Sequence, residues 1–157
     1  MTHGNAFAGL ILCCAVWATG CPSDMCTLIG CGESLAIVIS HGDGGDLEGG
    51  EYIVEVRFDG EVADTLTCVP GGTNECDATP GAGILTGTMD ATSIDLSYGD
   101  SGDELPGAIQ ITVSFAGETL GAQSFEPSWS VDYPNGEECE PACWTADDEE
   151  LEIDRPN

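Results

Sequence analysis

The chain contains no lysine, and its cationic side chains are limited to Arg57 and Arg155. Against these two stand 29 Asp and Glu residues, so the formal net charge is −27 at pH 7. Proteins hold phosphate backbones with Lys and Arg, so this composition excludes nucleic acids and anionic membrane surfaces as partners. Hydrophobic residues still make up 41% of the chain and alternate regularly, which predicts a folded core inside an acidic shell.

Motifs for catalysis are also missing. The sequence has no phosphate-binding glycine loop, no HExxH segment and no basic residues placed to clamp an anion. Residues 99–103 (GDSGD) resemble the segment around the nucleophile of chymotrypsin-like proteases, and His41 lies upstream of them. That triad requires a double barrel with an oxyanion hole, for which the chain is too short. We therefore predict that the protein is not an enzyme and that His41 makes an ordinary polar contact.

The first twenty residues have the features of a leader. They contain no Lys, Arg, Asp or Glu, and residues 6–19 form an apolar run too short to span a bilayer as a helix. The run ends in ATGC at positions 18–21, which resembles a bacterial lipobox, in which small residues precede the lipidated cysteine. We expect a cleaved lipoprotein signal peptide over 1–20 and a lipid on Cys21. An ordinary cleaved signal and a wrongly assigned start are the alternatives.

Nine cysteines are present, of which Cys13 and Cys14 leave with the leader and Cys21 takes the lipid. In an exported chain the remaining cysteines predict a disulfide framework. They are Cys26, Cys31, Cys68, Cys76, Cys139 and Cys143. We predict the local pairs 26–31, 68–76 and 139–143, because each pair brackets a turn. Zinc is the rival interpretation, since the first and last pairs have acceptable ligand spacing, although no histidine lies near either.

One stretch of sequence occurs twice, 57 residues apart. Residues 37–61 align without a gap with residues 94–118, and 11 of the 25 positions are identical. Duplication of one supersecondary unit explains this pattern, with internal repeats over 37–70 and 94–127. Each copy is predicted to supply a strand, a loop and a hairpin.

Apolar and polar residues alternate with a period of two along most of the body, which predicts β-strands. The predicted strands are 34–40, which is apolar on both faces as in a central strand, together with 51–58, 61–69, 93–98, 108–115, 118–125 and 144–153. The last run carries many carboxylates, as a protected edge strand would. Seven to nine short strands and no amphipathic helix predict an all-β fold, an Ig-like antiparallel β-sandwich. We place a cysteine-containing tether over 21–32 and the sandwich domain over 33–155.

The segment 133–143 reads YPNGEECEPAC. Together with the cysteine-rich start of the body and the Asp-Gly hairpin, it resembles a group of small myxobacterial lipoproteins that end in a PNGxxCxPxC segment. The similarity covers most of the body, and these eleven residues are its specific part. The resemblance implies an envelope location and a β fold, and it implies no activity.

Two loops rich in glycine and acid occupy equivalent places in the repeats. Such loops offer closely spaced oxygen ligands, which calcium prefers. The candidate calcium ligands are Asp43, Asp46, Asp100 and Asp103, with Glu48 and Glu104 nearby. Gly and Asp are also common in loops because they tolerate left-handed backbone and cap turns, so calcium is a hypothesis and no other cofactor is expected.

Two functions are consistent with these features. The first is an acidic lipoprotein of the cell envelope with a non-catalytic structural or accessory role, located in the outer membrane or periplasm, or secreted if Cys21 carries no lipid. The alternative is a calcium-assisted β-sandwich module that binds a glycan or an envelope protein. For sugar stacking the candidate aromatic residues are Trp129, Tyr133 and Trp144, of which we expect Trp129 in the core.

Overall fold

The computed structural model describes residues 31, 33–71, 74–79, 85–99, 105–137 and 142–156. In this part of the chain there are eleven strands and no helix. The strands are β1 (Glu33–His41), β2 (Tyr52–Phe58), β3 (Glu61–Cys68), β4 (Asp77–Thr79), β5 (Leu85–Met89), β6 (Ser93–Gly99), β7 (Ile109–Phe115), β8 (Glu118–Phe125), β9 (Ser130–Asp132), β10 (Cys143–Thr145) and β11 (Glu149–Ile153). The prediction of an all-β protein is confirmed.

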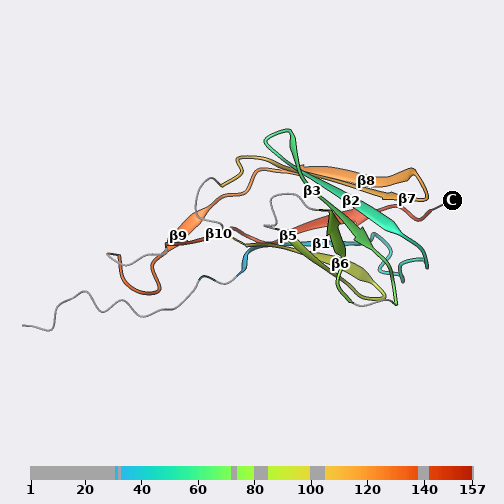
Figure 1. Ribbon diagram of the computed structural model, residues 1–157, viewed down its shortest axis with the longest axis horizontal. Coiled ribbons are helices and arrows are strands. Elements are labelled where there is room, and N and C mark those ends of the chain that lie inside the picture. Colours follow the sequence, from blue (N-terminus) through green and yellow to red (C-terminus); the bar gives the residue numbers. More distant parts are fainter. Residues whose placement is uncertain are drawn as a thin grey trace, which may run out of the picture.

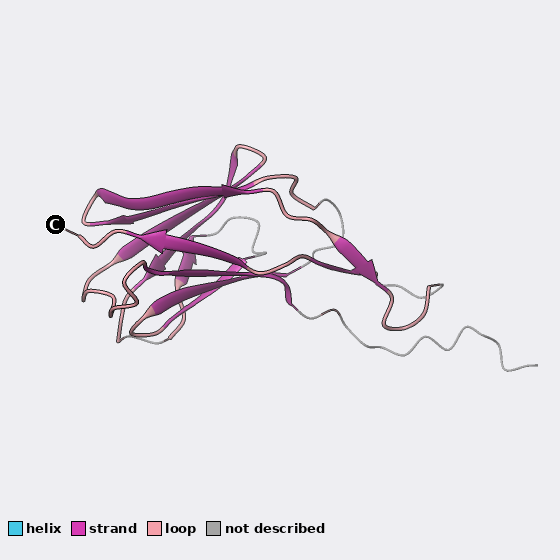
Figure 2. Ribbon diagram, turned by 180° about the vertical axis from the view of Figure 1, so that it is seen from behind, coloured by secondary structure: helices cyan, strands magenta, loops and turns pink. Residues whose placement is uncertain are grey.

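Two sheets pack face to face as a sandwich (Figure 1). One has the strand order β11-β1-β6-β5 and the other β4-β3-β2-β7-β8, while β9 and β10 form a separate two-stranded ribbon. Neighbouring strands are antiparallel except for β1 and β11, which are parallel. The β9–β10 ribbon extends from one end of the sandwich, here called the ribbon end, and the C-terminus lies at the opposite, C-terminal end (Figures 1 and 2).

Alternating side chains of the central strands fill the space between the sheets. In β2, Tyr52, Val54 and Val56 are fully buried, and β7 buries every second residue in the same way. Burial of one such side chain is worth about 1.5–3 kcal/mol, so the period-two pattern fixes which face of each strand points inward. The core therefore depends on the residues that made the strands recognisable in sequence.

The two sequence copies are related by an approximate two-fold axis through both sheets. In each sheet a residue pairs with its own counterpart 57 positions later, Val38 with Asp95 and Glu55 with Thr112. The hairpin turns also match, because Asp59 (φ 51°) and Gly60 (φ 90°) have the same left-handed backbone as residues 116 and 117. Both hairpins shift register at equivalent points. Because equivalent strands are antiparallel, the two-fold axis exchanges the two ends of the sandwich. Equivalent loops therefore leave from opposite ends.

Backbone hydrogen bonds connect the two sheets along both of their long sides. On one side the amide of Asp154, after β11, donates to Leu120 of β8 at 2.9 Å. On the other side Cys76 donates to Gly87 and Met89 donates to Asn74, both at 2.8 Å. These contacts satisfy edge groups that would otherwise be open to pairing with other chains.

Some predicted elements were wrong in detail. The run 144–153 is not one strand, because residues 146–148 carry the chain from the ribbon to the edge of the first sheet, where Ala146 donates to Ser34 at 2.9 Å. As predicted, its second half is an edge strand, β11. The short β4 lies inside a region expected to be loop, and it forms by pairing with β3. Propensity alone does not reveal such a strand, since neighbouring structure decides it.

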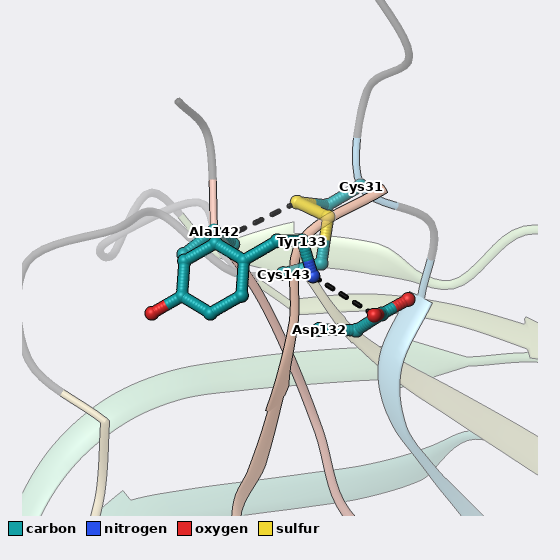
Figure 3. Close-up of a disulfide and its surroundings, with 5 residues drawn as sticks. All are labelled: Cys31, Asp132, Tyr133, Ala142 and Cys143. Carbon is teal, nitrogen blue, oxygen red and sulfur yellow. Dashed lines mark hydrogen bonds between the residues drawn. A yellow bond between two sulfur atoms is a disulfide. The ribbon is translucent and has the colours of Figure 1, made fainter. Parts of the chain in front are cut away.

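The predicted cysteine pairing is correct for one pair and wrong for the other two. Cys68 and Cys76 form the expected local disulfide. Cys31, however, is bonded to Cys143, which excludes the pairs 26–31 and 139–143 (Figure 3). The cause is that the chain after β10 runs beside the start of β1, so Cys143 comes within 5.2 Å of Cys31, Cα to Cα. The zinc interpretation fails for the same reason, because one cysteine of each proposed ligand pair is oxidised.

Candidate functional site

A group of charged side chains gathers at the C-terminal end of the sandwich. His41 is the last residue of β1, and it pairs with Ile153, the last residue of the parallel strand β11. Parallel neighbours end at the same edge of a sheet, so the loop after β1 and the tail after β11 emerge side by side. Asp43 and Glu48 come from the loop, and Arg155 comes from the tail.

Arg155 connects the tail to both carboxylates of the loop. Its Nε and Nη2 donate to the two oxygens of Asp43, each at 3.0 Å, and its Nη1 donates to Oε1 of Glu48 at 2.9 Å. Asp43 Oδ1 also accepts the amide of Gly45 at 3.0 Å. A Cβ atom at position 45 would overlap Nη2 of Arg155, so a side chain there would displace the guanidinium from its present position. We call the set of His41, Asp43, Glu48 and Arg155 the C-terminal clasp.

His41 is the buried part of the clasp, with only 2% of its surface exposed. Its Nε2 lies 3.0 Å from Oε2 of Glu48, and its Nδ1 lies 3.3 Å from the carbonyl oxygen of Ile153. A carbonyl only accepts hydrogen bonds, so Nδ1 donates to Ile153, and the carboxylate of Glu48 lies within hydrogen-bond distance of Nε2. The hydroxyl of Tyr52 donates to the same Glu48 oxygen at 3.4 Å. His41 therefore makes the polar contact expected of it.

The contacts of Arg155 shift the titration of its partners. Its hydrogen bonds, helped by the Gly45 amide, hold the pKa of Asp43 below the ordinary value. Burial raises the pKa of Glu48, but a backbone hydrogen bond and the contacts with His41 and Arg155 outweigh it, so the net shift is downward. The pKa of Arg155 is raised in return by Asp43 and Glu48. Asp43, Glu48 and Arg155 therefore form a set of opposite charges that stay ionised at neutral pH.

A pocket of about 410 Å³ opens beside the clasp. Its lining residues are His41, Gly42, Asp43, Glu152, Ile153, Asp154 and Arg155. Among these lining residues carboxylates outnumber the guanidinium, and none is a hydroxyl or thiol nucleophile. Both ring nitrogens of His41 are engaged, so this arrangement is suited to holding the C-terminal tail against the loop.

The two candidate calcium ligands in the described residues, Asp43 and Asp46, do not form a metal site. Asp43 is taken by Arg155, so a cation there would have to displace the guanidinium. Asp46 is exposed in the same loop, and the described residues contain no group of three or more His, Cys, Asp or Glu side chains that could hold a metal. Asp100 and Asp103 lie outside the described residues. Gly99, just before them, pairs with Glu33 at the ribbon end, so the two loops do not start from one surface.

The other predicted positions divide between the core and the ribbon. Trp129 packs against the core, its ring 5.7 Å from that of Tyr98, and its Nε1 donates to the carbonyl of Pro106 at 2.9 Å. Tyr133 and Trp144 belong to the ribbon, and Tyr133 is 38% exposed. Cys21, Cys26 and Cys139 lie outside the described residues.

Sequence reasoning missed the clasp. The one usable signal was the scarcity of cations, since a lone Arg155 among so many acids must lie close to carboxylates. Which carboxylates it meets depends on the parallel pairing of β1 with β11, strands that begin 116 residues apart. No local pattern encodes that pairing.

Replacement of Arg155 by Gln should loosen the loop after β1. We expect amide hydrogen exchange of residues 42–48 to become several-fold faster at pH 7, because the clasp loses its cation. The pKa of Asp43, followed by NMR, should rise toward its ordinary value. Since the folded pKa values of Asp43 and Glu48 are depressed, their contribution is present at neutral pH and is lost as the pH falls through those values.

The matched control is Arg57→Gln. Arg57 contacts Glu55 at 2.9 Å and the Gly60 carbonyl at 3.2 Å, away from the clasp. Exchange of residues 42–48 should not change in this variant. Equal acceleration in both variants would show that loss of any cation loosens the loop through net charge.

No protein-family model, curated protein or solved structure matches this chain. Within the described residues, no helix is long and apolar enough to cross a bilayer.

Proposed function

We propose that the protein is a non-catalytic lipoprotein of the cell envelope, anchored through Cys21, with a structural or accessory role. The observation that carries this proposal is the disulfide between Cys31 and Cys143. It joins the segment that follows the proposed anchor to the ribbon at one end of the sandwich. A covalent bond thus fixes the segment after the proposed anchor to the body, as suits a domain that is held at a surface.

The two disulfides also support a location outside the cytoplasm. Disulfides form and persist in oxidising compartments and are rare in the reducing cytosol. Cys68 is fully buried and lies in the core, so its bond to Cys76 is part of the folded architecture. The apolar leader and the ATGC segment before position 22 supply the export and lipidation signals in this proposal.

The body is proposed to be Ig-like on the basis of strand order. In Ig domains, strands A-B-E-D form one sheet and the GFC strands, extended by C′, form the other. The orders β1-β6-β5 and β3-β2-β7-β8 correspond to B-E-D and C′-C-F-G. β11 occupies the position of strand A but enters from the other end of the chain. Folds of this kind serve many unrelated functions, so strand order supports the architecture alone.

Intact mass of the protein extracted from native membranes tests the proposal. We expect a chain that begins at Cys21, carries the added mass of lipid, and shows six thiols only after reduction. Replacement of Cys21 by Ala should abolish the lipid mass, while the disulfides remain intact. A chain that retains its first twenty residues, or one with free thiols before reduction, contradicts export.

A further inference from the structure

The β9–β10 ribbon has one apolar and one polar face. Val131 of β9 pairs directly with Trp144 of β10, so their side chains share a face. Tyr133, two residues after Val131, continues the same face. Asp132 pairs with Cys143 and lies on the other face, and Figure 3 shows Asp132 and Tyr133 directed to opposite sides of the ribbon. The carboxylate of Asp132 therefore does not interrupt the apolar face.

This ribbon face is unusually exposed for an apolar surface. Val131 is 39% exposed and Tyr133 is 38% exposed, and Trp144 is half-buried. Among the described residues only Val62 and Val69 are comparable exposed hydrophobic side chains. Single exposed apolar residues are common on proteins, whereas an aliphatic and two aromatic side chains on one projecting face indicate a contact surface.

The ribbon is held next to the proposed anchor. Cys143 of β10 is bonded to Cys31, and Cys31 follows Cys21 by ten residues. Ten residues span at most about 35 Å, so a lipid on Cys21 would keep the ribbon close to the bilayer. The C-terminal end of the sandwich points the other way (Figure 2). The apolar face is thus at the same end of the body as Cys31, to which the proposed anchor segment is attached.

We propose that the face formed by Val131, Tyr133 and Trp144 rests on the zwitterionic headgroup surface of the membrane that carries the anchor. This inference rests on the proposed lipidation of Cys21. Tyr and Trp concentrate at bilayer interfaces because an apolar ring and a polar group are both accommodated there. The net charge of −27 disfavours an anionic surface, and it equally disfavours a second copy of this chain as the occupant.

Tryptophan quenching by brominated phosphatidylcholine tests this contact. The lipidated protein is reconstituted into vesicles of this lipid, and emission is compared with that in unbrominated vesicles. After removal of the leader only Trp129 and Trp144 remain, and Trp129 contributes the same background throughout. We expect quenching at least about twofold stronger in the wild type than in Val131→Ser/Tyr133→Ser, which should release the face from the lipid.

The matched control is Val62→Ser/Val69→Ser, which removes the two exposed valines outside the ribbon. Its quenching should equal that of the wild type. Equal quenching in all three proteins overturns the ribbon contact. A second outcome also overturns the membrane contact: quenching is weak in the wild type, and the wild type is retained on a polysaccharide matrix while Val131→Ser/Tyr133→Ser is not. The ribbon face would then bind a glycan.

Intact mass of the same preparation reports separately on the anchor. A protein without lipid on Cys21 refutes the envelope proposal, whatever the ribbon does. The unlipidated protein is then added to the same vesicles from solution. Stronger quenching of the wild type than of Val131→Ser/Tyr133→Ser still supports the contact, and equal quenching overturns it.

Discussion

With Cys26 and Cys139 already replaced by Ala, replacement of both Cys31 and Cys143 by Ala is expected to lower the free energy of unfolding by about 5 kcal/mol, the largest loss that we predict. The two cysteines are 112 residues apart, so their bond closes a loop that includes nearly the whole described sandwich. Without it, the unfolded chain gains the freedom of a loop of that length. The folded structure keeps its sheets, because the bond lies at the ribbon end, outside the core.

The matched control is replacement of Cys68 and Cys76 by Ala. These residues are only 8 apart, and the same relation gives a loss of about 2.5 kcal/mol. Urea denaturation under non-reducing conditions gives both values, and similar slopes would show that the unfolded states are comparable. Equal losses in the two variants would contradict the argument from loop length.

The second large effect concerns Asp64, a carboxyl group on the inward face of β3. Asp64 is only 2% exposed, and it precedes the inward-facing Leu66 and Cys68 in the alternation of the strand. One of its oxygens accepts the amide of Thr65 at 3.2 Å, and the other has no hydrogen-bond partner among the described residues. Burial raises the pKa of Asp64, and the Thr65 amide only partly opposes the shift. An ionised carboxylate at this position therefore costs stability.

Replacement of Asp64 by Asn should raise the free energy of unfolding by about 1–3 kcal/mol at pH 7. Asn keeps an oxygen for the Thr65 amide and removes the buried charge. Because the folded pKa of Asp64 is above its unfolded value, the penalty is present while the carboxylate is ionised. It declines as the pH falls through the folded pKa. The advantage of Asn over Asp should therefore shrink on acidification, as measured by urea denaturation at several pH values.

Asp77→Asn is the control for Asp64→Asn, since Asp77 is exposed on β4. It removes the same charge from the acidic surface and should change stability little. If both variants were stabilised equally, relief of the overall negative charge would explain the gain, and the buried position of Asp64 would not matter. A loss of stability in Asp64→Asn alone would show that the charged form makes a favourable contact.

The second sequence copy supports this interpretation of Asp64. The equivalent residue is Gly121, and a Cβ atom there would lie 2.9 Å from the Cγ2 of Ile153 on β11. The same strand position thus accommodates close packing in one copy and a carboxyl group in the other. The fold does not require a charge at this point.

The parts of the fold that were predictable from sequence are those encoded locally. Alternation placed β2, β7 and β8 nearly to the residue, and the Asp59-Gly60 turn marked its hairpin because its backbone needs positive φ. Asp64 lies within a predicted strand, and nothing in the sequence singled it out. Its burial depended on how the sheets pack, which the strand itself does not specify.

The features that escaped prediction depend on contacts distant in sequence. β11 pairs with β1 across the whole domain, and this one pairing brings Arg155 to Asp43. Likewise, the crossing of the chain from β10 to β11 brings Cys143 to Cys31. Six cysteines permit many connectivities, and proximity in sequence was a poor guide because β1 and β11, the first and last strands, pair in the first sheet.

The two-fold relation between the copies has a consequence for how the protein can change. The repeated segment contributes to both ends of the sandwich. At the C-terminal end, the copy carrying His41 helps to hold the residues after β11. At the ribbon end, the copy carrying Tyr98 packs against Trp129, which leads into the ribbon. Substitutions in one copy can therefore alter one end of the sandwich, while the paired strands between the two ends stay the same.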